Sequence, residues 1–180
     1  MPPRRILLYG VTGSGKSTAT SRIGERLGLP TTLVDDLAWL PDWVQRPEDD
    51  VLAVVAEVAQ GDEWVIDTAY GYMLDLLLAR AELIVGLDYS RWFSLWRLVR
   101  RTARRAATGE SVCNGNRETW RTIFSRDSII LWHFRSWRRK RDRMRAWSAD
   151  PQRPPTLLFR RPPDLDRWID ALPDEKALSR

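Results

Sequence analysis

The sequence predicts a three-layer α/β domain built on a five-stranded parallel sheet. Short apolar runs of strand length alternate with segments of helix length along almost the whole chain. Such alternation builds right-handed strand–helix–strand crossovers, which place helices on both faces of a parallel sheet. The 180 residues, of which 43% are hydrophobic, suit one domain of ordinary size with a packed core. We therefore expect residues 1–180 to form a single domain.

Five apolar segments are the expected strands. The first ends at Gly10, as a buried parallel strand that leads into a tight loop would. Ligands of such sheets bind at the carboxyl ends of the strands. The residues that follow each strand are therefore the first candidates for chemistry. The expected strands are Arg5–Tyr9, Thr31–Val34, Glu63–Asp67, Glu82–Asp88 and Thr156–Arg160.

Helices are expected between these strands, and turn residues separate two of them. Residues 108–116 are rich in Gly, Asn, Ser and Thr, so they predict a loop. The side chains of Trp92, Trp96, Val99 and Ala103 form a helical stripe that we expect to pack in the core. The expected helices cover about 16–27, 48–59, 72–80, 90–107, 118–149 and 164–172.

The most specific motif is G-x-x-x-x-G-K-S, from Gly10 to Ser17, between the first strand and the first helix. Its glycines permit unusual backbone conformations, and its N–H groups and the helix N-terminus face an anion. Lys16 is expected to contact the β- and γ-phosphates, Ser17 a Mg²⁺ ion and Thr18 the α-phosphate. The loop therefore predicts binding of Mg²⁺ and ATP through Gly10, Thr12, Gly13, Ser14, Gly15, Lys16, Ser17 and Thr18.

Acidic residues follow two neighbouring expected strands. Asp67 ends the third strand and is the candidate for a second metal ligand, directly or through water. Asp35 and Asp36 follow the second strand, so Asp35 could assist the metal while Asp36 orients or deprotonates an acceptor hydroxyl. Each carboxylate could instead cap a turn or a helix. The nearby Trp39 and Trp43 either wall a substrate pocket or simply pack.

Positive charge is concentrated in one block of the chain. Residues 90–145 carry 16 Lys and Arg against four acidic residues, whereas the rest carries 13 basic and 20 acidic side chains. A polyanion is expected near such a block, and either a nucleoside triphosphate or a nucleic acid would satisfy it.

Part of this block has the form of a hinged lid. Two helices joined by a glycine-containing loop, about residues 101–126, are inserted between the fourth and fifth strands. Closing this lid would bring arginines onto a transferring phosphoryl group and exclude water. The favoured arginines are Arg101, Arg105, Arg117 and Arg121, and the alternative is a solvated basic face.

The run Arg135–Arg145 carries charges all round its helix, so they cannot all line one site. It is expected to be a solvated helix that contacts acids, with a nucleic-acid surface as the alternative. His133 is the only histidine and has no nearby partner of ligand type, so no metal site is expected there.

Cysteine usage and hydropathy bear on the compartment. The single cysteine, Cys113, excludes an internal disulfide and favours a reducing compartment, so a cytoplasmic location is expected. No apolar stretch approaches the roughly 20 residues of a membrane-spanning helix, so no membrane association is expected.

Taken in order, five segments of residues 4–170 resemble the adenylate-kinase-related P-loop kinases, in particular the bacterial branch labelled topology modulation protein. They read ILLYGVTGSGKST, LVDDLAWLPDW, WVIDTAYG, LIVGLDYSRWFSLWRLVRRT and CNGNRETWR. The resemblance implies a sheet ordered 2-3-1-4-5, a lid after strand four and ATP-dependent phosphotransfer. It also implies an adenine pocket near Arg160–Pro163, with Arg161 as a nucleotide-binding candidate.

The acceptor side departs from true adenylate kinases. Those enzymes carry D-G-[FY]-P-R after strand three, where this chain has D-T-A-Y-G, and a T-G-D-x-x-R segment that this chain lacks. Between Leu27 and Tyr89 the only basic residues are Arg46 and Arg80. A second nucleotide usually meets several arginines. The pattern therefore favours a neutral or cationic hydroxyl compound held by Asp36 and Tyr70, with AMP as the alternative acceptor.

The leading functional prediction is a kinase that uses Mg²⁺ and ATP to phosphorylate a nucleotide or another small molecule. A regulatory nucleic-acid-binding P-loop protein, with Arg135–Arg145 as its contact, is the alternative from another class. A slow ATPase whose acceptor is water is the third.

Overall fold

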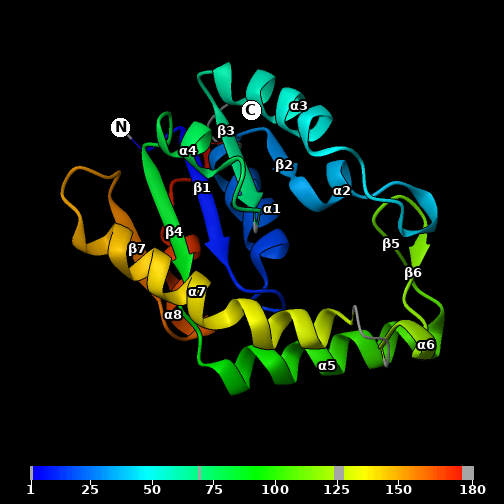
Figure 1. The fold of residues 1–180 in the computed structure, drawn as a ribbon. Coiled ribbons are helices and arrows are strands. Elements are labelled where there is room, and N and C mark those ends of the chain that lie inside the picture. The colour runs from blue at the N-terminus through cyan, green and yellow to red at the C-terminus, as the bar shows by residue number, and fades with distance from the viewer. Residues whose placement is uncertain (1, 69, 124–127, 176–180) are drawn as a thin grey trace.

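The computed structural model describes residues 2–68, 70–123 and 128–175 and contains a five-stranded parallel sheet (Figure 1). Its order is β2-β3-β1-β4-β7, which confirms the expected order 2-3-1-4-5, because β7 is the fifth predicted strand. The strands are β1 (Arg5–Gly10), β2 (Thr31–Leu33), β3 (Trp64–Thr68), β4 (Leu83–Leu87) and β7 (Thr156–Phe159).

Two hydrophobic clusters sandwich the sheet, one on each face. Alternation along β1 sends Leu7 and Tyr9 into one cluster and Ile6 and Leu8 into the other, and all four side chains are fully buried. Helices α2 (Val34–Ala38), α3 (Glu48–Gln60), α4 (Leu74–Leu78) and α7 (Ile129–Ala149) contribute to the first cluster. Helices α1 (Lys16–Leu27) and α8 (Pro162–Asp170) contribute to the second.

Helix α5 (Arg91–Thr108) runs beside α7 beneath the carboxyl ends of β1 and β4 (Figure 1). The prediction that its Trp92, Trp96 and Val99 pack in the core is wrong, since they are 72%, 55% and 42% exposed. The buried stripe consists instead of Ser94, Leu98 and Thr102. The physical reason is that the phosphate loop, described below, packs on this face of α5, where Gly13 lies against Ser94 and Leu98.

The lid region is more structured than predicted. Where a plain loop was expected, strands β5 (Ser111–Val112) and β6 (Asn116–Arg117) form an antiparallel hairpin. The single helix expected over 118–149 is wrong, because Ser128, between α6 (Trp120–Ile123) and α7, has an extended backbone that interrupts the helix. The Ser128 hydroxyl accepts a hydrogen bond of 3.2 Å from the Ile130 N–H and so caps α7 afresh. The expected lid extends to residue 126, so residues 124–126 lie outside the described residues.

The connection after β2 also differs from the expected loop. Asp35 and Asp36 lie in the short helix α2, which a 3₁₀ turn, Pro41–Trp43, follows. The indole rings of Trp39 and Trp43 pack edge to face, with centroids 5.7 Å apart. Among the described residues, no helix combines the length and the apolar character needed to cross a membrane.

Candidate functional site

The phosphate loop is held against α5 by close backbone contact. Gly13 and Gly15 have φ values of 82° and 92°, a region that favours glycine. A Cβ on Gly13 would lie 2.7 Å from the Ser94 carbonyl oxygen and 2.8 Å from the Leu98 Cβ. The loop can therefore dock on α5 only with glycine at this position. The motif from Gly10 to Thr18 thus keeps the strand–loop–helix setting that the sequence predicts, since β1 precedes it and α1 follows it.

Lys16 begins α1, and its ammonium turns back over the loop. Its Nζ donates a hydrogen bond of 3.3 Å to the Val11 carbonyl oxygen. Burial lowers the pKa of Lys16, and the carboxylates of Asp67 and Asp35 act in the opposite direction. The ammonium therefore lies close to both acidic candidates, as the catalytic assignment requires.

Ser17 and Asp67 meet at the carboxyl edge of β1 and β3. The Ser17 hydroxyl donates a hydrogen bond of 2.9 Å to Asp67 Oδ2, and the Val34 N–H donates one of 3.1 Å to Oδ1. Burial raises the pKa of Asp67, while the nearby Lys16 opposes that rise. Two oxygens suited to Mg²⁺ are thus oriented side by side. The described residues contain no group of three or more His, Cys, Asp or Glu side chains placed to hold a metal ion.

Asp35 and Asp36 point to different surroundings. Asp35 Oδ1 accepts a hydrogen bond of 2.9 Å from the Tyr70 hydroxyl, and its charge acts on both Lys16 and Arg101. Both carboxylates lie near the Cys113 thiol, whose pKa is raised to about 12, mainly by burial and then by the charges of Asp35 and Asp36. Asp36, however, is not among the charges that act on Lys16 or Arg101. The carboxylate that lies among the site's charged groups is therefore Asp35.

The four favoured arginines separate into two pairs. Burial lowers the pKa of Arg101, which also lies near Asp35 and Arg105. Arg105 is mostly buried and pairs with Glu118 at 3.4 Å. Arg117, on the hairpin, and Arg121, on α6, are exposed. The structure thus brings Arg101 to the phosphate loop side and leaves Arg117 and Arg121 in solvent.

Arg97 is a residue that the sequence reasoning did not select for the site. Its guanidinium lies over the phosphate loop, where Nη1 donates a hydrogen bond of 3.4 Å to the Ser14 carbonyl oxygen. A Cβ on Gly15 would lie 2.9 Å from Arg97 Nη2, the movable end of that side chain, so it is the φ of 92° rather than this contact that favours glycine here. Its spacing of four residues from Arg101 on one helix was the available signal.

The predicted nucleotide candidate Arg161 lies at the N-cap of α8, at the carboxyl end of β7. Its side chain pairs with Asp164 at 2.9 Å and is otherwise exposed. Next to it, Arg160 lies 3.9 Å from the fully buried Asp88. This corner of the sheet neighbours the phosphate loop through β4, which pairs with β1 at Gly10.

The hairpin of β5 and β6 lies beside the segment that follows α2 (Figure 1). Two of its asparagines hydrogen-bond to the chain after β2. Asn114 Nδ2 donates to the carbonyl oxygens of Asp36 and Trp39, each at 2.7 Å. Asn116 Nδ2 donates to the Leu40 carbonyl oxygen at 2.9 Å, and its Oδ1 accepts a hydrogen bond of 2.6 Å from the Trp43 N–H. Trp43 Nε1 completes the contact with a 3.1 Å hydrogen bond to the Arg117 carbonyl oxygen. The hairpin therefore lies against the segment that begins at Asp36.

The basic run Arg135–Arg145 is largely engaged within the protein. Arg141 and Arg145 pair with the buried Asp88 at 2.9 and 2.8 Å. Arg143 donates a hydrogen bond to Tyr9, and Lys140 is buried. Four of the seven basic side chains in the run are therefore held inward, which agrees with the expected acid contacts and reduces the surface open to a polyanion.

His133 takes part in the packing of α7 against α5. Its imidazole is buried and lies 2.9 Å from the Ser94 hydroxyl. Burial lowers its pKa to about 4, and the neighbouring Arg91 acts in the same direction. The ring is therefore neutral at physiological pH.

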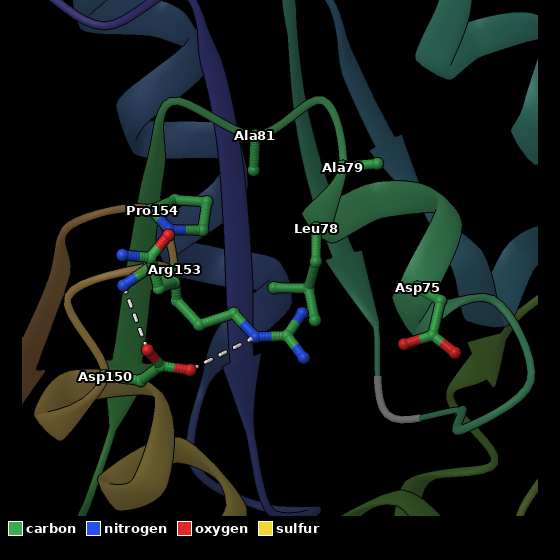
Figure 2. Close-up of a pocket in the computed structure, with 8 residues that line it drawn as sticks. Asp75, Leu78, Ala79, Ala81, Asp150, Arg153 and Pro154 are labelled. Carbon is green, nitrogen blue, oxygen red and sulfur yellow. Dashed lines mark hydrogen bonds and ion pairs between the residues drawn. The ribbon is translucent and has the colours of Figure 1, made fainter.

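A cavity of about 610 Å³ lies at the opposite edge of the sheet, away from these residues. Figure 2 shows its lining, in which Asp150 pairs with Arg153 and Asp75 stands across the opening. The cavity is bounded by the end of α4 and the turn between α7 and β7, just before β4 and β7 begin. It therefore belongs to the amino ends of the strands and is separate from the phosphate loop.

Comparison with known proteins locates the fold. No protein-family model matches the sequence, and a comparison with curated proteins finds no relative. Solved structures that match over 98% of this chain include a gluconokinase from Sinorhizobium meliloti 1021, at 21% identity, 93% coverage of that chain and a TM-score of 0.55. A sugar kinase from Janibacter sp. HTCC2649 matches at 18% identity, 98% coverage and a TM-score of 0.56. A shikimate kinase from Acinetobacter baumannii, solved with shikimate, matches at 19% identity, 93% coverage and a TM-score of 0.59. The chain therefore has the fold of these P-loop kinases.

Proposed function

We propose that this protein is an ATP-dependent kinase that transfers the γ-phosphoryl group to a hydroxyl group of a small molecule. The observation that carries the proposal is the pairing of Ser17 with Asp67 beside the half-buried Lys16 ammonium. A phosphate-binding loop alone fits many nucleotide-binding proteins. A hydroxyl and a carboxylate oriented together at its edge match the metal site that phosphoryl transfer needs.

The donor set fits Mg²⁺, which is usually bound in such sites by one or two protein oxygens together with phosphate oxygens and water. Ser17 Oγ and Asp67 Oδ2 would hold it, and Asp67 is kept in place by the Val34 N–H. The bound ion would neutralise charge on the β- and γ-phosphates.

The chain's own residues supply the rest of the chemistry. Lys16 and Arg101 stabilise negative charge on the phosphoryl group as its bond to the β-phosphate oxygen breaks. The acceptor hydroxyl oxygen forms the new bond to phosphorus, and its proton passes to a carboxylate. We assign that role to Asp35 in place of the sequence-based candidate Asp36, because Asp35 interacts with Lys16, Arg101 and Tyr70.

The comparisons support the reaction class through the names of the matched proteins, which are kinases of gluconate, a sugar and shikimate. The topology-modulation branch suggested by the sequence motifs, the use of ATP with Mg²⁺ and a cytoplasmic location belong to this proposal. Nucleic-acid binding through Arg135–Arg145 is the less favoured function, since four of that run's basic side chains are held within the protein.

The test is a phosphotransfer assay with Mg²⁺ and ATP across a panel of acceptors that includes AMP, gluconate and shikimate. Phosphorylated products are identified by mass spectrometry, so hydrolysis to free phosphate is scored separately. Lys16→Ala should abolish transfer with the fold retained, and Arg135→Met, an exposed charge on α7, serves as the matched control. Full activity in Lys16→Ala would exclude the mechanism.

A further inference from the structure

Helix α7 carries a lysine in its buried stripe. The stripe consists of His133, Ser136, Lys140, Met144 and Trp147, at helical spacing. Lys140 is only 2% exposed, and its Nζ has no hydrogen-bond partner among the residues that the structure describes. The face of the Trp132 ring lies 5.9 Å from the ammonium, near the outer limit of a cation–π contact. A buried ammonium without a partner is costly, so its position calls for an explanation.

The groups around this ammonium belong to the proposed active site. The charges that act on Lys140 come from Lys16 on α1, Asp35 on α2, and Arg139 and Arg143 on its own helix. The ammonium is therefore close enough to the phosphate-loop lysine, and to the carboxylate that accepts a hydrogen bond from Tyr70, for their charges to act on it. Burial lowers the pKa of Lys140 to about 7, with the Lys16 charge as the next cause.

A second cation lies one turn further along α7. Arg143 Nη1 donates a hydrogen bond of 3.3 Å to the Tyr9 hydroxyl at the end of β1. The same atom would lie 3.8 Å from a Cβ on Gly71, in the segment that follows β3. Lys140 and Arg143 therefore follow the carboxyl edge of β1 and β3, on the side of Asp35 and Tyr70. Residues 27–89 alone make the surroundings of Asp35 and Tyr70 acidic and aromatic. Helix α7 adds positive charge to this region.

We propose that Lys140, with Arg143 beside it, forms an oxyanion-binding subsite on the acceptor side, which takes an anionic group of the acceptor. The proposal rests on the proposed kinase function and narrows its substrate class to hydroxyl compounds that also carry a carboxylate or a phosphate. The occupant supplies the partner that the ammonium lacks. It also holds the acceptor so that its hydroxyl lies between Asp35 and the phosphoryl group that Lys16 binds.

The experiment uses the full chain saturated with Mg²⁺ and adenylyl imidodiphosphate, so that the triphosphate position is filled. Inorganic phosphate, acetate and the neutral acetamide are then titrated up to high millimolar concentrations, and binding is followed by calorimetry and thermal unfolding. The variants are Lys140→Met, Lys140→Arg and the control Arg135→Met, which removes an exposed charge from the same helix. The phosphate and acetate arms distinguish the two classes of acceptor.

The expected result is that at least one anion binds and acetamide does not. Lys140→Met should weaken that binding about tenfold or more, as expected for a lost charge-assisted hydrogen bond, while Lys140→Arg retains it and Arg135→Met leaves it unchanged. Binding of no anion, or equal binding in Lys140→Met, would overturn the subsite. If Lys140→Met instead lost affinity only for the triphosphate analogue and kept its affinity for ADP, the ammonium would contact the transferred phosphoryl group. That result would also overturn the subsite. Failure of the kinase proposal differs, since the analogue itself would then not bind.

Discussion

Ser17 Oγ donates a hydrogen bond of 2.9 Å to Asp67 Oδ2 across 50 residues of sequence. This contact joins the end of the phosphate loop to β3. It exists because β1 and β3 are neighbours whose register pairs Leu8 with Asp67, one residue before Tyr9 pairs with Thr68. The carboxyl ends of two parallel strands thereby deliver a hydroxyl and a carboxylate to one point.

Asp67→Asn tests the metal site at this contact. The amide keeps the shape and the Val34 hydrogen bond but loses the charge, so the Mg²⁺ concentration for half-maximal rate should rise about 10- to 100-fold. Because burial raises the pKa of Asp67, the metal-free protein should unfold at the same or a higher temperature. A magnesium titration and a thermal melt measure both effects. The exposed Asp62→Asn is the control, and an unchanged magnesium dependence in Asp67→Asn would argue against the site.

Asp35→Asn and Asp36→Asn form a matched pair of neighbouring carboxylates. Removing the proton acceptor should lower kcat about 10²- to 10⁴-fold, and this loss is expected in Asp35→Asn alone. Asp35, and not Asp36, is the carboxylate of this pair whose charge acts on Lys16 and Arg101, so Asp36→Asn should keep most of the activity. Steady-state kinetics with the acceptor found in the panel decide between them. A loss in Asp36→Asn alone would restore the assignment made from the sequence.

Asn116→Ala removes hydrogen bonds that join the hairpin to the segment after β2. The change leaves the Trp43 N–H and the Leu40 carbonyl without their side-chain partner, at a cost of about 1–3 kcal/mol for the closed lid. Because a closed lid excludes water, hydrolysis of ATP should rise relative to transfer. The ratio of free phosphate to phosphorylated acceptor measures the effect. Ser111→Ala, exposed on the same hairpin, should leave the ratio as it is in the unaltered protein.

Lys140→Met tests the buried ammonium through pH. The folded-state pKa is about 7, against 10.5 for the free side chain, so the unfolded chain binds more protons between these values and stability should rise with pH there. Lys140→Met should flatten this rise. At pH 6 its free energy of unfolding should be larger than that of the unaltered protein by on the order of 2–4 kcal/mol, so it should unfold at a higher temperature. Thermal melts from pH 6 to 10 provide the measurement. Parallel curves for the two proteins would show that Lys140 is not held in a costly charged state.

Local pattern was sufficient to predict the strands of the sheet and to predict that Lys16, Ser17 and Asp67 would lie close together. Strand order followed from a resemblance carried by ordered motifs, and the sites of Lys16, Ser17 and Asp67 follow from strand ends that must share one edge. The stripe of Trp92, Trp96 and Val99 was misassigned because helical periodicity identifies a face without saying what it packs against. The docking of Gly13 on Ser94 and Leu98 decided which face of α5 turned inward.

The residues proposed for the acceptor side could be grouped only from the tertiary structure. They come from distant segments of the chain, and packing rather than a sequence motif brings them together. The choice between Asp35 and Asp36 depends on which side of α2 lies against Tyr70. The residues next to them in the sequence do not indicate which side that is. Lys140 belongs to a run of basic residues that the sequence does not distinguish from one another. Only the packing of α7 on the sheet shows that Lys140 is buried. By itself, then, the sequence determined the phosphate loop and the strand edge, since glycines, a lysine and strand-end acids act through local geometry. Only the tertiary structure decided which charges lie near one another at the carboxyl edge of the sheet, because the packing of segments far apart in the sequence selects them.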